Sequence, residues 1–154
     1  MPEHSEAPPP QRPDNLGFLL REPFRVGSDL LHERFAERGH PEVRAPHGNV
    51  FQFLDESGTR VSVLAQRAQV TKQSMAELVR HLESRGYIER VPDPTDRRAK
   101  LVRATARGRE IYAIAREFVE ELEADWAERI GEAKMNKLRV LLKDLNNAVV
   151  PSSR

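Results

Sequence analysis

Residues 58–105 read GTRVSVLAQRAQVTKQSMAELVRHLESRGYIERVPDPTDRRAKLVRAT, and this stretch decides the fold. Its middle predicts a helix between Thr71, whose side-chain oxygen can cap the N-terminus, and Gly86, which can adopt the left-handed conformation that ends a helix. Between these two residues the apolar side chains recur every three or four positions, as on one face of an amphipathic helix. They are Met75, Leu78, Val79 and Leu82.

The opposite face of this helix is polar and basic, so one side packs against the protein while the other is free to contact a ligand. A shorter helix is expected just before it, at about residues 63–69. Two helices joined by so short a turn are typical of a helix-turn-helix whose second helix enters the DNA major groove. Many buried helix pairs share this pattern, so the pair alone does not establish DNA binding. The exposed face comprises Lys72, Gln73, Ser74, Glu77, Arg80 and Ser84.

The sequence after this helix predicts a β-hairpin. Residues 87–91 and 99–103 alternate apolar and polar side chains, as half-buried strands do, and residues 92–96 have the Pro and Asp content of a turn. Such a hairpin is the wing of a winged helix. Its tip and return strand are rich in cations, and an arginine there can enter the narrow, electronegative minor groove. These cations are Arg97, Arg98, Lys100 and Arg103.

Three parts of this region resemble the winged helix-turn-helix of the MarR family of bacterial transcription regulators. They are VTKQSMAELVRHLESRGYIER at 70–90, the wing DPTDRRAKLV at 93–102, and ATARGR at 104–109, which resembles the family's Leu-Thr-x-x-Gly junction. The resemblance is clear over residues 58–110 and rests on helix pattern alone elsewhere. It implies a mainly α fold with a small β-hairpin wing, in which a winged helix-turn-helix domain is joined to a helical dimerisation region.

DNA contacts are expected from both the helix and the wing. In the major groove glutamine suits adenine, arginine suits guanine and glutamate can accept from cytosine, while the N-terminus of the helix suits a phosphate. In the wing, the resemblance implies that Arg98 enters the minor groove and that Asp96 holds Arg98 or a neighbouring arginine in place. A surface ion pair of little energetic consequence is the simpler alternative. The expected DNA-binding residues are Thr71, Lys72, Gln73, Ser74, Glu77, Arg80, Asp96, Arg97, Arg98 and Lys100.

The charge distribution supports a nucleic-acid partner. The chain has 154 residues and a net charge of +1, but residues 60–109 hold twelve Lys and Arg against five Asp and Glu, which leaves the remainder net negative. A basic segment on an acidic scaffold is typical of nucleic-acid readers. A basic face that is merely solvated would instead spread its charges evenly.

Composition excludes several functional classes. There is no cysteine, which excludes disulfides, thiolate metal sites and a cysteine redox switch. No apolar run is long enough to span a membrane and no signal-peptide core is present, so the protein is expected in the cytoplasm. Since the sequence has no Gly-rich phosphate loop, no glycine-flanked serine and no metal-ligand pair four apart on a helix, neither an enzyme nor a cofactor is expected.

The rest of the chain predicts helices on either side of the winged helix-turn-helix, which we call the reader. A helix over about 16–38 is expected to kink at Pro23 or to start only near Glu22, because proline removes a backbone donor. A short helix begins near Pro46, and two long helices follow the wing. The expected division is a disordered arm at 1–14, an N-terminal dimerisation helix at 15–45, the winged helix-turn-helix domain at 46–105 and C-terminal dimerisation helices at 106–150, themselves helical over 106–130 and 132–149.

The two C-terminal helices carry more leucine than one chain can cover. The last of them has a heptad-like apolar stripe at its exposed end, so a second copy of the chain is expected to pack against it. An intramolecular helical bundle in a monomer is the alternative. The resemblance also implies a dimer, and a two-fold dimer would place two readers on half-sites about one DNA turn apart.

Small-molecule and metal sites are less well defined by the sequence. Members of the resembled family commonly bind small aromatic or anionic effectors between the dimerisation helices and the reader, a region that would involve Phe35, Arg44, His47 and Phe51. Burial preference alone makes these four residues core or packing positions. The spacing of the histidines at 32, 40 and 47 fits no compact ligand motif, so no metal site is expected.

Together these observations predict a homodimeric, sequence-specific DNA-binding transcription regulator that acts on a pseudo-palindromic operator, as a repressor released by a small-molecule effector. Two alternatives remain at this point. One is a winged helix that binds proteins, which would not show the steep salt dependence of a DNA reader. The other is a DNA-binding activator or architectural protein without an effector.

Overall fold

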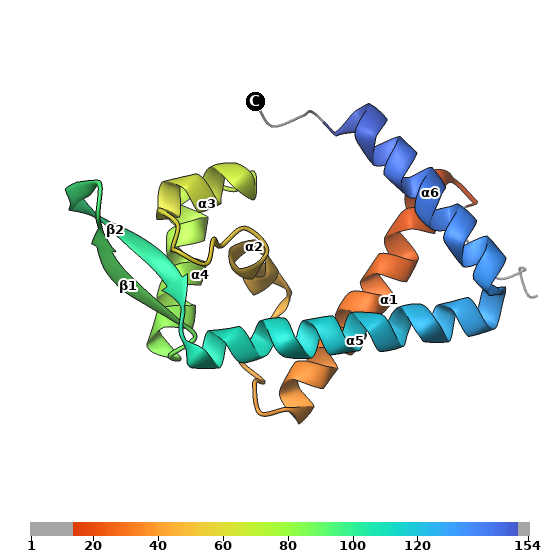
Figure 1. Ribbon diagram of the computed structural model, residues 1–154, viewed down its shortest axis with the longest axis horizontal. Helices are drawn as coiled ribbons and strands as arrows, with labels where there is room; N and C mark the ends of the chain where they lie inside the picture. Colours follow the sequence, from red (N-terminus) through yellow and green to blue (C-terminus); the bar gives the residue numbers. More distant parts are fainter. Residues whose placement is uncertain (1–13, 151–154) are drawn as a thin grey trace, which may run out of the picture.

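The computed structural model describes residues 14–150, so the arm expected at 1–14 lies almost entirely outside the described residues. The fold is mainly helical with one two-stranded antiparallel sheet. Figure 1 shows the reader at one end and a helical arm at the other, with the longest helix joining the two. The elements are α1 (Leu16–Glu37), η1 (Ala45–His47), α2 (Gly48–Phe51), α3 (Val61–Arg67), α4 (Lys72–Ser84), β1 (Ile88–Asp93), β2 (Asp96–Ala104), α5 (Ala106–Ile130) and α6 (Glu132–Val149).

Helix α4 has the caps and the apolar face that its sequence predicts. The Thr71 hydroxyl accepts a hydrogen bond from the Ser74 backbone N–H at 3.1 Å, and Gly86 has a φ of +76° just beyond the last turn. Met75, Val79 and Leu82 are fully buried. The helix is therefore fixed by one face in the core and keeps its polar face in solvent.

Helix α3 begins two residues earlier than the expected residue 63 and ends at Arg67. The chain leaves it through Gln69, whose φ is +54°, in the left-handed region that favours glycine. Leu64 and Ala65 are buried against α4, so the two helices form the helix-turn-helix.

Replacing Gln69 by glycine is expected to stabilise the protein. The left-handed conformation costs an L-residue about 1–2 kcal/mol, whereas the extra freedom of glycine in the unfolded chain costs about 0.5–1 kcal/mol. The net gain should be about 0.5–1 kcal/mol, measured by urea unfolding. A loss of stability would show that the Gln69 side chain makes contacts that outweigh its backbone strain.

The strands of the wing are longer than the sequence predicts. Strand β1 continues to Asp93, and β2 already begins at Asp96. A third segment joins the sheet: Thr59 exchanges backbone hydrogen bonds with Val102, at 2.8 and 2.9 Å. Gly58, with a φ of +101°, permits this approach, since a Cβ there would lie 2.9 Å from the Leu101 Cβ. The start of α3 is thus attached to the wing.

Helix α1 runs without a break from Leu16 to Glu37, so the later start near Glu22 is wrong. The Asn15 side chain caps it by accepting from the Phe18 N–H at 3.0 Å, which stabilises the turns before Pro23. The short helix near Pro46 is a 3₁₀ turn followed by α2, which ends at Phe51.

The junction between the wing and α5 is closely packed. Thr105 caps α5 by accepting from the Gly108 N–H at 3.2 Å, and its hydroxyl donates to the Gly86 carbonyl at 2.6 Å. A Cβ on Gly108 would lie 2.0 Å from the Tyr87 carbonyl oxygen, so only glycine fits here. These contacts explain in physical terms why the junction has the spacing Thr-x-x-Gly.

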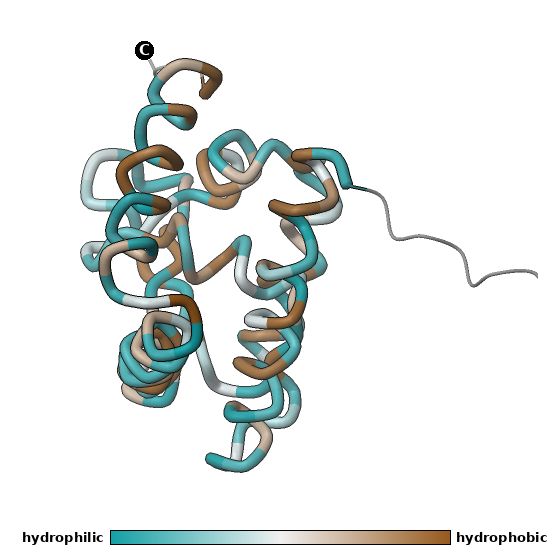
Figure 2. The backbone as a smooth tube through the Cα atoms, turned by 90° about the vertical axis from the view of Figure 1, so that its right-hand side faces the viewer, coloured by the Kyte–Doolittle hydropathy of each residue, from teal (hydrophilic) through white to brown (hydrophobic). Residues whose placement is uncertain are grey.

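The helical arm is formed by α1, α5 and α6. Helix α1 lies against α5, where Gly27 faces Leu122 and Trp126, and ion pairs join Arg34 to Glu121 at 2.9 Å and Arg38 to Glu117 at 3.1 Å. Along α6, which ends near the C label in Figure 2, apolar and polar stretches alternate. Between residues 14 and 150, no helix is long and apolar enough to cross a membrane.

Candidate nucleic-acid interface

The polar face of α4 is presented to solvent as a unit. Lys72, Gln73, Ser74, Glu77 and Arg80 are all exposed, on the side of α4 opposite to its buried residues. Two of them have internal hydrogen bonds: the Thr71 hydroxyl donates to the Ser74 Oγ at 2.8 Å, and the Arg80 Nε donates to the Ala76 carbonyl at 3.3 Å. That bond uses the Nε of Arg80 and does not occupy its terminal guanidinium nitrogens.

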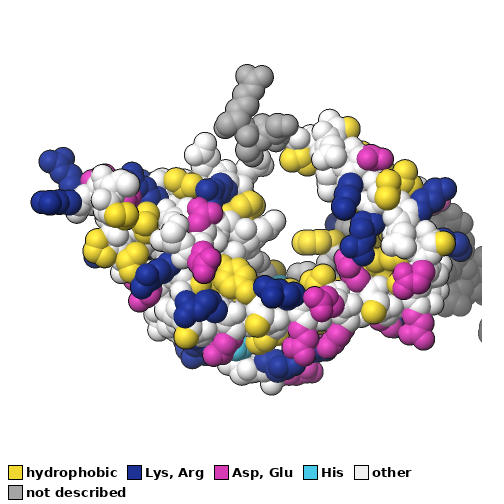
Figure 3. Space-filling model, viewed as in Figure 1, with side chains coloured by type: hydrophobic (Ala, Val, Ile, Leu, Met, Phe, Trp, Pro, Cys, Tyr) yellow, Lys and Arg dark blue, Asp and Glu magenta, His cyan; other side chains and the backbone are white. Residues whose placement is uncertain are grey.

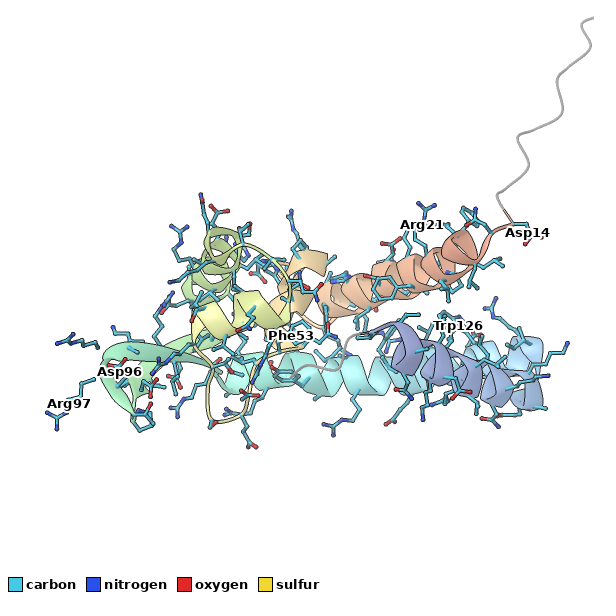
Figure 4. All side chains as sticks on the ribbon, turned by 90° about the horizontal axis from the view of Figure 1, so that it is seen from above. Asp14, Arg21, Phe53, Asp96, Arg97 and Trp126 are labelled. Carbon is cyan, nitrogen blue, oxygen red and sulfur yellow. The ribbon has the colours of Figure 1, made fainter. Side chains whose placement is uncertain are left out.

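The register of the hairpin explains why the wing arginines protrude. Pro92 pairs with Lys100 and Asp93 pairs with Asp96, so the register shifts and residues 97–99 bulge from β2. A bulge redirects the side chains that it carries. Arg97 accordingly extends beyond the outer end of the hairpin, away from the helices (Figure 4), and Arg98 is also exposed.

Asp96 holds Arg98 through the backbone, and not through the arginine side chain. Its Oδ1 accepts from the backbone N–H of Arg98 at 3.0 Å, and its Oδ2 lies 3.7 Å from a guanidinium nitrogen of Arg60, the residue before α3. It therefore fixes the backbone of Arg98. The arginine side chain that it meets belongs to another element.

A second carboxylate, Asp93, is the main anchor of the wing tip. It is buried, it forms a hydrogen bond of 2.6 Å with the Arg60 Nε, and it accepts from the Thr95 hydroxyl at 2.7 Å and N–H at 2.8 Å. The hydrogen bonds from Thr95, followed by those from Arg60, lower the pKa of Asp93 to about 2. Asp93 is therefore ionised whenever the protein is near neutral pH.

Some cations of the reader form ion pairs within the protein, whereas others have no carboxylate partner among the described residues. Arg103 binds Glu89 across the strands at 2.7 Å and Arg90 binds Glu83 at 3.1 Å, so Arg103 has a structural partner and is not a free cation of the wing. Among the described residues 14–150, no carboxylate lies within 4.0 Å of the cationic groups of Lys72, Arg97, Arg98 or Lys100.

These four cations lie on two elements that a DNA reader uses. Figure 3 shows Lys and Arg at the outer end of the hairpin, and carboxylates along the helical arm. Positive charge that is not neutralised within the protein attracts phosphate. The reader end thus has both the shape and the charge to bind duplex DNA.

Comparison with known proteins agrees with this geometry. A family model described as "MarR family" matches residues 43–99, from the segment before α2 through the bulge of the wing. Over these residues the chain is similar to the MarR family. It is a winged-helix, DNA-binding transcriptional regulator.

Three proteins illustrate the similarity. The transcriptional regulator HosA of Escherichia coli O111:H- is 28% identical over 133 residues, covering 84% of this chain and 98% of HosA. The HTH-type transcriptional repressor Mb2911 of Mycobacterium bovis is 29% identical, covering 86% and 94%. The crystal structure of CouR from Rhodococcus jostii RHA1 bound to p-coumaroyl-CoA is 25% identical with a TM-score of 0.68, covering 92% of this chain and 96% of CouR.

The four candidate effector residues lie around α1, η1 and α2, but mostly in the core. Phe35 and Phe51 are buried, and Phe51 meets Tyr112 edge-on with ring centroids 5.5 Å apart. His47 is buried too, and its Nδ1 accepts from the Arg44 backbone N–H at 2.9 Å. Arg44 alone is exposed. None of the four lines the open depression of about 270 Å³ beside α5, which Arg38, His40, Glu110 and Glu117 border.

The histidines form contacts that their spacing does not reveal. His47 stacks on His81 of α4 with ring centroids 4.7 Å apart, and the Nε2 of His81 is buried without a hydrogen-bond partner. His40 lies elsewhere, 3.1 Å from the Tyr87 hydroxyl. Within residues 14–150, no three His, Cys, Asp or Glu side chains are grouped so as to hold a metal ion.

Sequence reasoning missed two polar networks of this protein. One is the Arg60–Asp93 pair at the wing. The other surrounds the Tyr87 hydroxyl, which donates to Glu42 at 3.0 Å and accepts from Arg107 at 3.1 Å. Both networks join segments far apart in the sequence. The only local signal was the unusual pair of aspartates in the wing turn.

Proposed function

We propose that this MarR-family regulator is a homodimer that acts in the cytoplasm on a pseudo-palindromic operator, as a repressor that a small-molecule effector releases, and that it has no enzymatic activity. The observation that supports this proposal most is the pairing of two surfaces on one chain. Free cations and a polar helix face lie at one end, and uncovered apolar residues lie at the other.

The apolar surface supports the dimer. Helix α1 exposes Leu16 by 61%, Leu20 by 39% and Phe24 by 76%, at a spacing of four residues along one face. Helix α6 exposes Leu138 by 44% and Leu141 by 55%. An apolar surface of this extent is typical of a protein–protein interface. A two-fold axis through it would duplicate the reader at a fixed separation.

Replacing Phe24 by aspartate is expected to dissociate the dimer. Burying an unpaired carboxylate in an apolar interface is strongly unfavourable, whereas the same side chain is solvated in a monomer. Light scattering at micromolar concentration should give twice the chain mass for the wild type and the chain mass for F24D. Ser62→Asp, an exposed change in α3, serves as the control and should stay dimeric. A wild-type monomer mass would contradict the dimer.

The DNA contacts follow from the two exposed elements. We place Gln73, Glu77 and Arg80 against base edges in the major groove, with Thr71, Lys72 and Ser74 at or near phosphates. Arg98 enters the minor groove, flanked by Arg97 and Lys100, while Asp96 holds the Arg98 backbone. Selection of bound sequences from random DNA tests the whole proposal, because a palindromic consensus would establish specificity and dimer symmetry together.

Replacing Arg98 by alanine is expected to weaken operator binding by roughly 1–3 kcal/mol, which is about tenfold to a hundredfold in Kd. Arg116→Ala is a matched control, because Arg116 is exposed on α5 and has no ion-pair partner in the described part of the chain. It should leave the Kd nearly unchanged. Equal Kd values for R98A and wild type, with both proteins folded, would remove the wing from the mechanism.

The effector is proposed to bind where α1 and α2 meet. CouR is bound to p-coumaroyl-CoA, an aromatic and anionic ligand. In this chain the exposed guanidinium of Arg44 would meet an anionic group, above Phe35, His47 and Phe51. Such a ligand releases DNA only if it binds the two dimer shapes with different affinities. Titrating aromatic acids and their CoA thioesters into an operator-binding assay, with Arg44→Ala for comparison, tests this placement.

A further inference from the structure

Arg60, the residue just before α3, is held beside the wing by the conformation and pairing of the two residues that precede it. Gly58 lets the chain cross β2 closely, and Thr59 then pairs with Val102 near the C-terminal end of that strand. Thr59 is buried, and its hydroxyl is fixed by Asp55 at 2.9 and 3.1 Å. Arg60 is therefore delivered to the base of the wing by the backbone itself, before its side chain makes any contact.

The guanidinium of Arg60 spans both wing aspartates. Its Nε lies 2.6 Å from Asp93, its terminal nitrogen lies 2.5 Å from the same carboxylate, and that nitrogen is 3.7 Å from Asp96. The Asp93 side chain is only 4% exposed, whereas that of Arg60 is 40% exposed. A charge-assisted hydrogen bond to a buried carboxylate is stronger and more directional than a surface ion pair.

The two aspartates in turn hold the backbone that carries the free arginines. Asp93 binds the Thr95 N–H and hydroxyl in the turn, and Asp96 binds the Arg98 N–H in the bulge. Residues 97–99 have lost the regular ladder that would otherwise fix them. Their position therefore depends on these side-chain hydrogen bonds.

The geometry points to Arg60 as a positioning residue for minor-groove recognition, which acts through Asp93 and Asp96 to fix the direction of Arg98. This inference rests on the proposed function, since it concerns how the wing reads DNA. Arg60 then contributes to DNA binding without itself touching the DNA. It also links the helix-turn-helix to the wing through one side chain.

A double-mutant cycle separates positioning from direct phosphate contact. Arg98→Ala should raise the Kd for the selected operator about tenfold or more in the wild type, but less than about threefold in an Arg60→Ala background, because an unanchored Arg98 has little left to lose. The matched control is Arg67→Ala. Arg67 lies on the same α3, is similarly exposed at 42%, and pairs with Asp55 instead of the wing. In the R67A background R98A should keep its full effect.

The sign of a second substitution provides an independent test. Asp93→Asn removes a negative charge, so simple electrostatics predicts tighter DNA binding, whereas loss of the Arg60 anchor predicts weaker binding and a smaller effect of R98A. Circular dichroism establishes that each variant is folded. If D93N does not fold, the R60A cycle decides alone.

The outcomes distinguish the two levels of the proposal. If the wild type binds no duplex selectively, or if R98A has no effect, the proposed function fails. If R98A weakens binding but its effect is the same in R60A as in wild type, the inference about Arg60 is overturned while the proposed function stands. Coupling between Arg60 and Arg98, absent between Arg67 and Arg98, supports it.

Discussion

Replacing Gly108 by alanine is expected to destabilise the folded protein by roughly 3 kcal/mol or more. A Cβ at this position would lie 2.0 Å from the Tyr87 carbonyl oxygen and 3.1 Å from its carbonyl carbon. These are backbone atoms at the start of the wing, and they cannot rotate away as a side chain can. The methyl group must therefore separate α5 from the hairpin. Urea unfolding measures the loss.

Gly48→Ala is the matched control for this prediction. Gly48 also lies in the first turn of a helix, but a Cβ there would meet no atom within 4 Å. Alanine has the higher helix propensity, so G48A should be neutral or stabilising by up to about 1 kcal/mol. If G108A were as stable as G48A, the close approach of α5 to Tyr87 would be wrong.

Acidification is expected to destabilise the protein through His47, by roughly 3 kcal/mol between pH 7 and pH 4. Burial lowers the pKa of His47 from 6.5 to about 4, with smaller contributions from His81, Arg44 and His32. The unfolded chain therefore binds a proton below pH 6.5 while the folded protein does not. The stability from neutral His47 is complete above pH 6.5 and is lost as the pH falls towards 4.

The variant His47→Gln isolates this contribution. Glutamine cannot titrate, yet its amide oxygen can still accept from the Arg44 N–H that the His47 Nδ1 now binds at 2.9 Å. The free energy of unfolding at pH 7 minus that at pH 4.5 should be smaller in H47Q than in wild type, measured at one protein concentration so that dimerisation contributes alike to both. Equal differences would show that folding does not lower the pKa of His47.

Much of the reader could be predicted because its signals are local. The cap at Thr71, the left-handed Gly86 and the apolar stripe of α4 each depend on residues within one helix, and the structure confirms them. The start of α5 and the break between α5 and α6 were predicted for the same reason. Thr105 caps the first turn of α5, and Gly131 separates the two helices. Short-range rules of this kind need no knowledge of the tertiary fold.

The features that were missed depend on contacts between distant segments. Arg60 and Asp93 are 33 residues apart, and they meet because Thr59 pairs with Val102 and the hairpin register shifts at Asp93. Proline propensity argued for a kink at Pro23 or a late start of α1, but the cap at Asn15 stabilises the turns before Pro23. The stack of His47 on His81 likewise joins the segment before α2 to α4. None of these has a signature in the local sequence.

Helix α5 connects the wing to the far end of the molecule as one uninterrupted rod. Its 25 residues give it a length of about 37 Å, so a tilt of about 5° at one end displaces the other by about 3 Å. That displacement is as long as a hydrogen bond. In the proposed dimer, a small rotation where the two copies meet would therefore be magnified into a mismatch with the spacing of the DNA grooves, and the protein would release its site without unfolding any element.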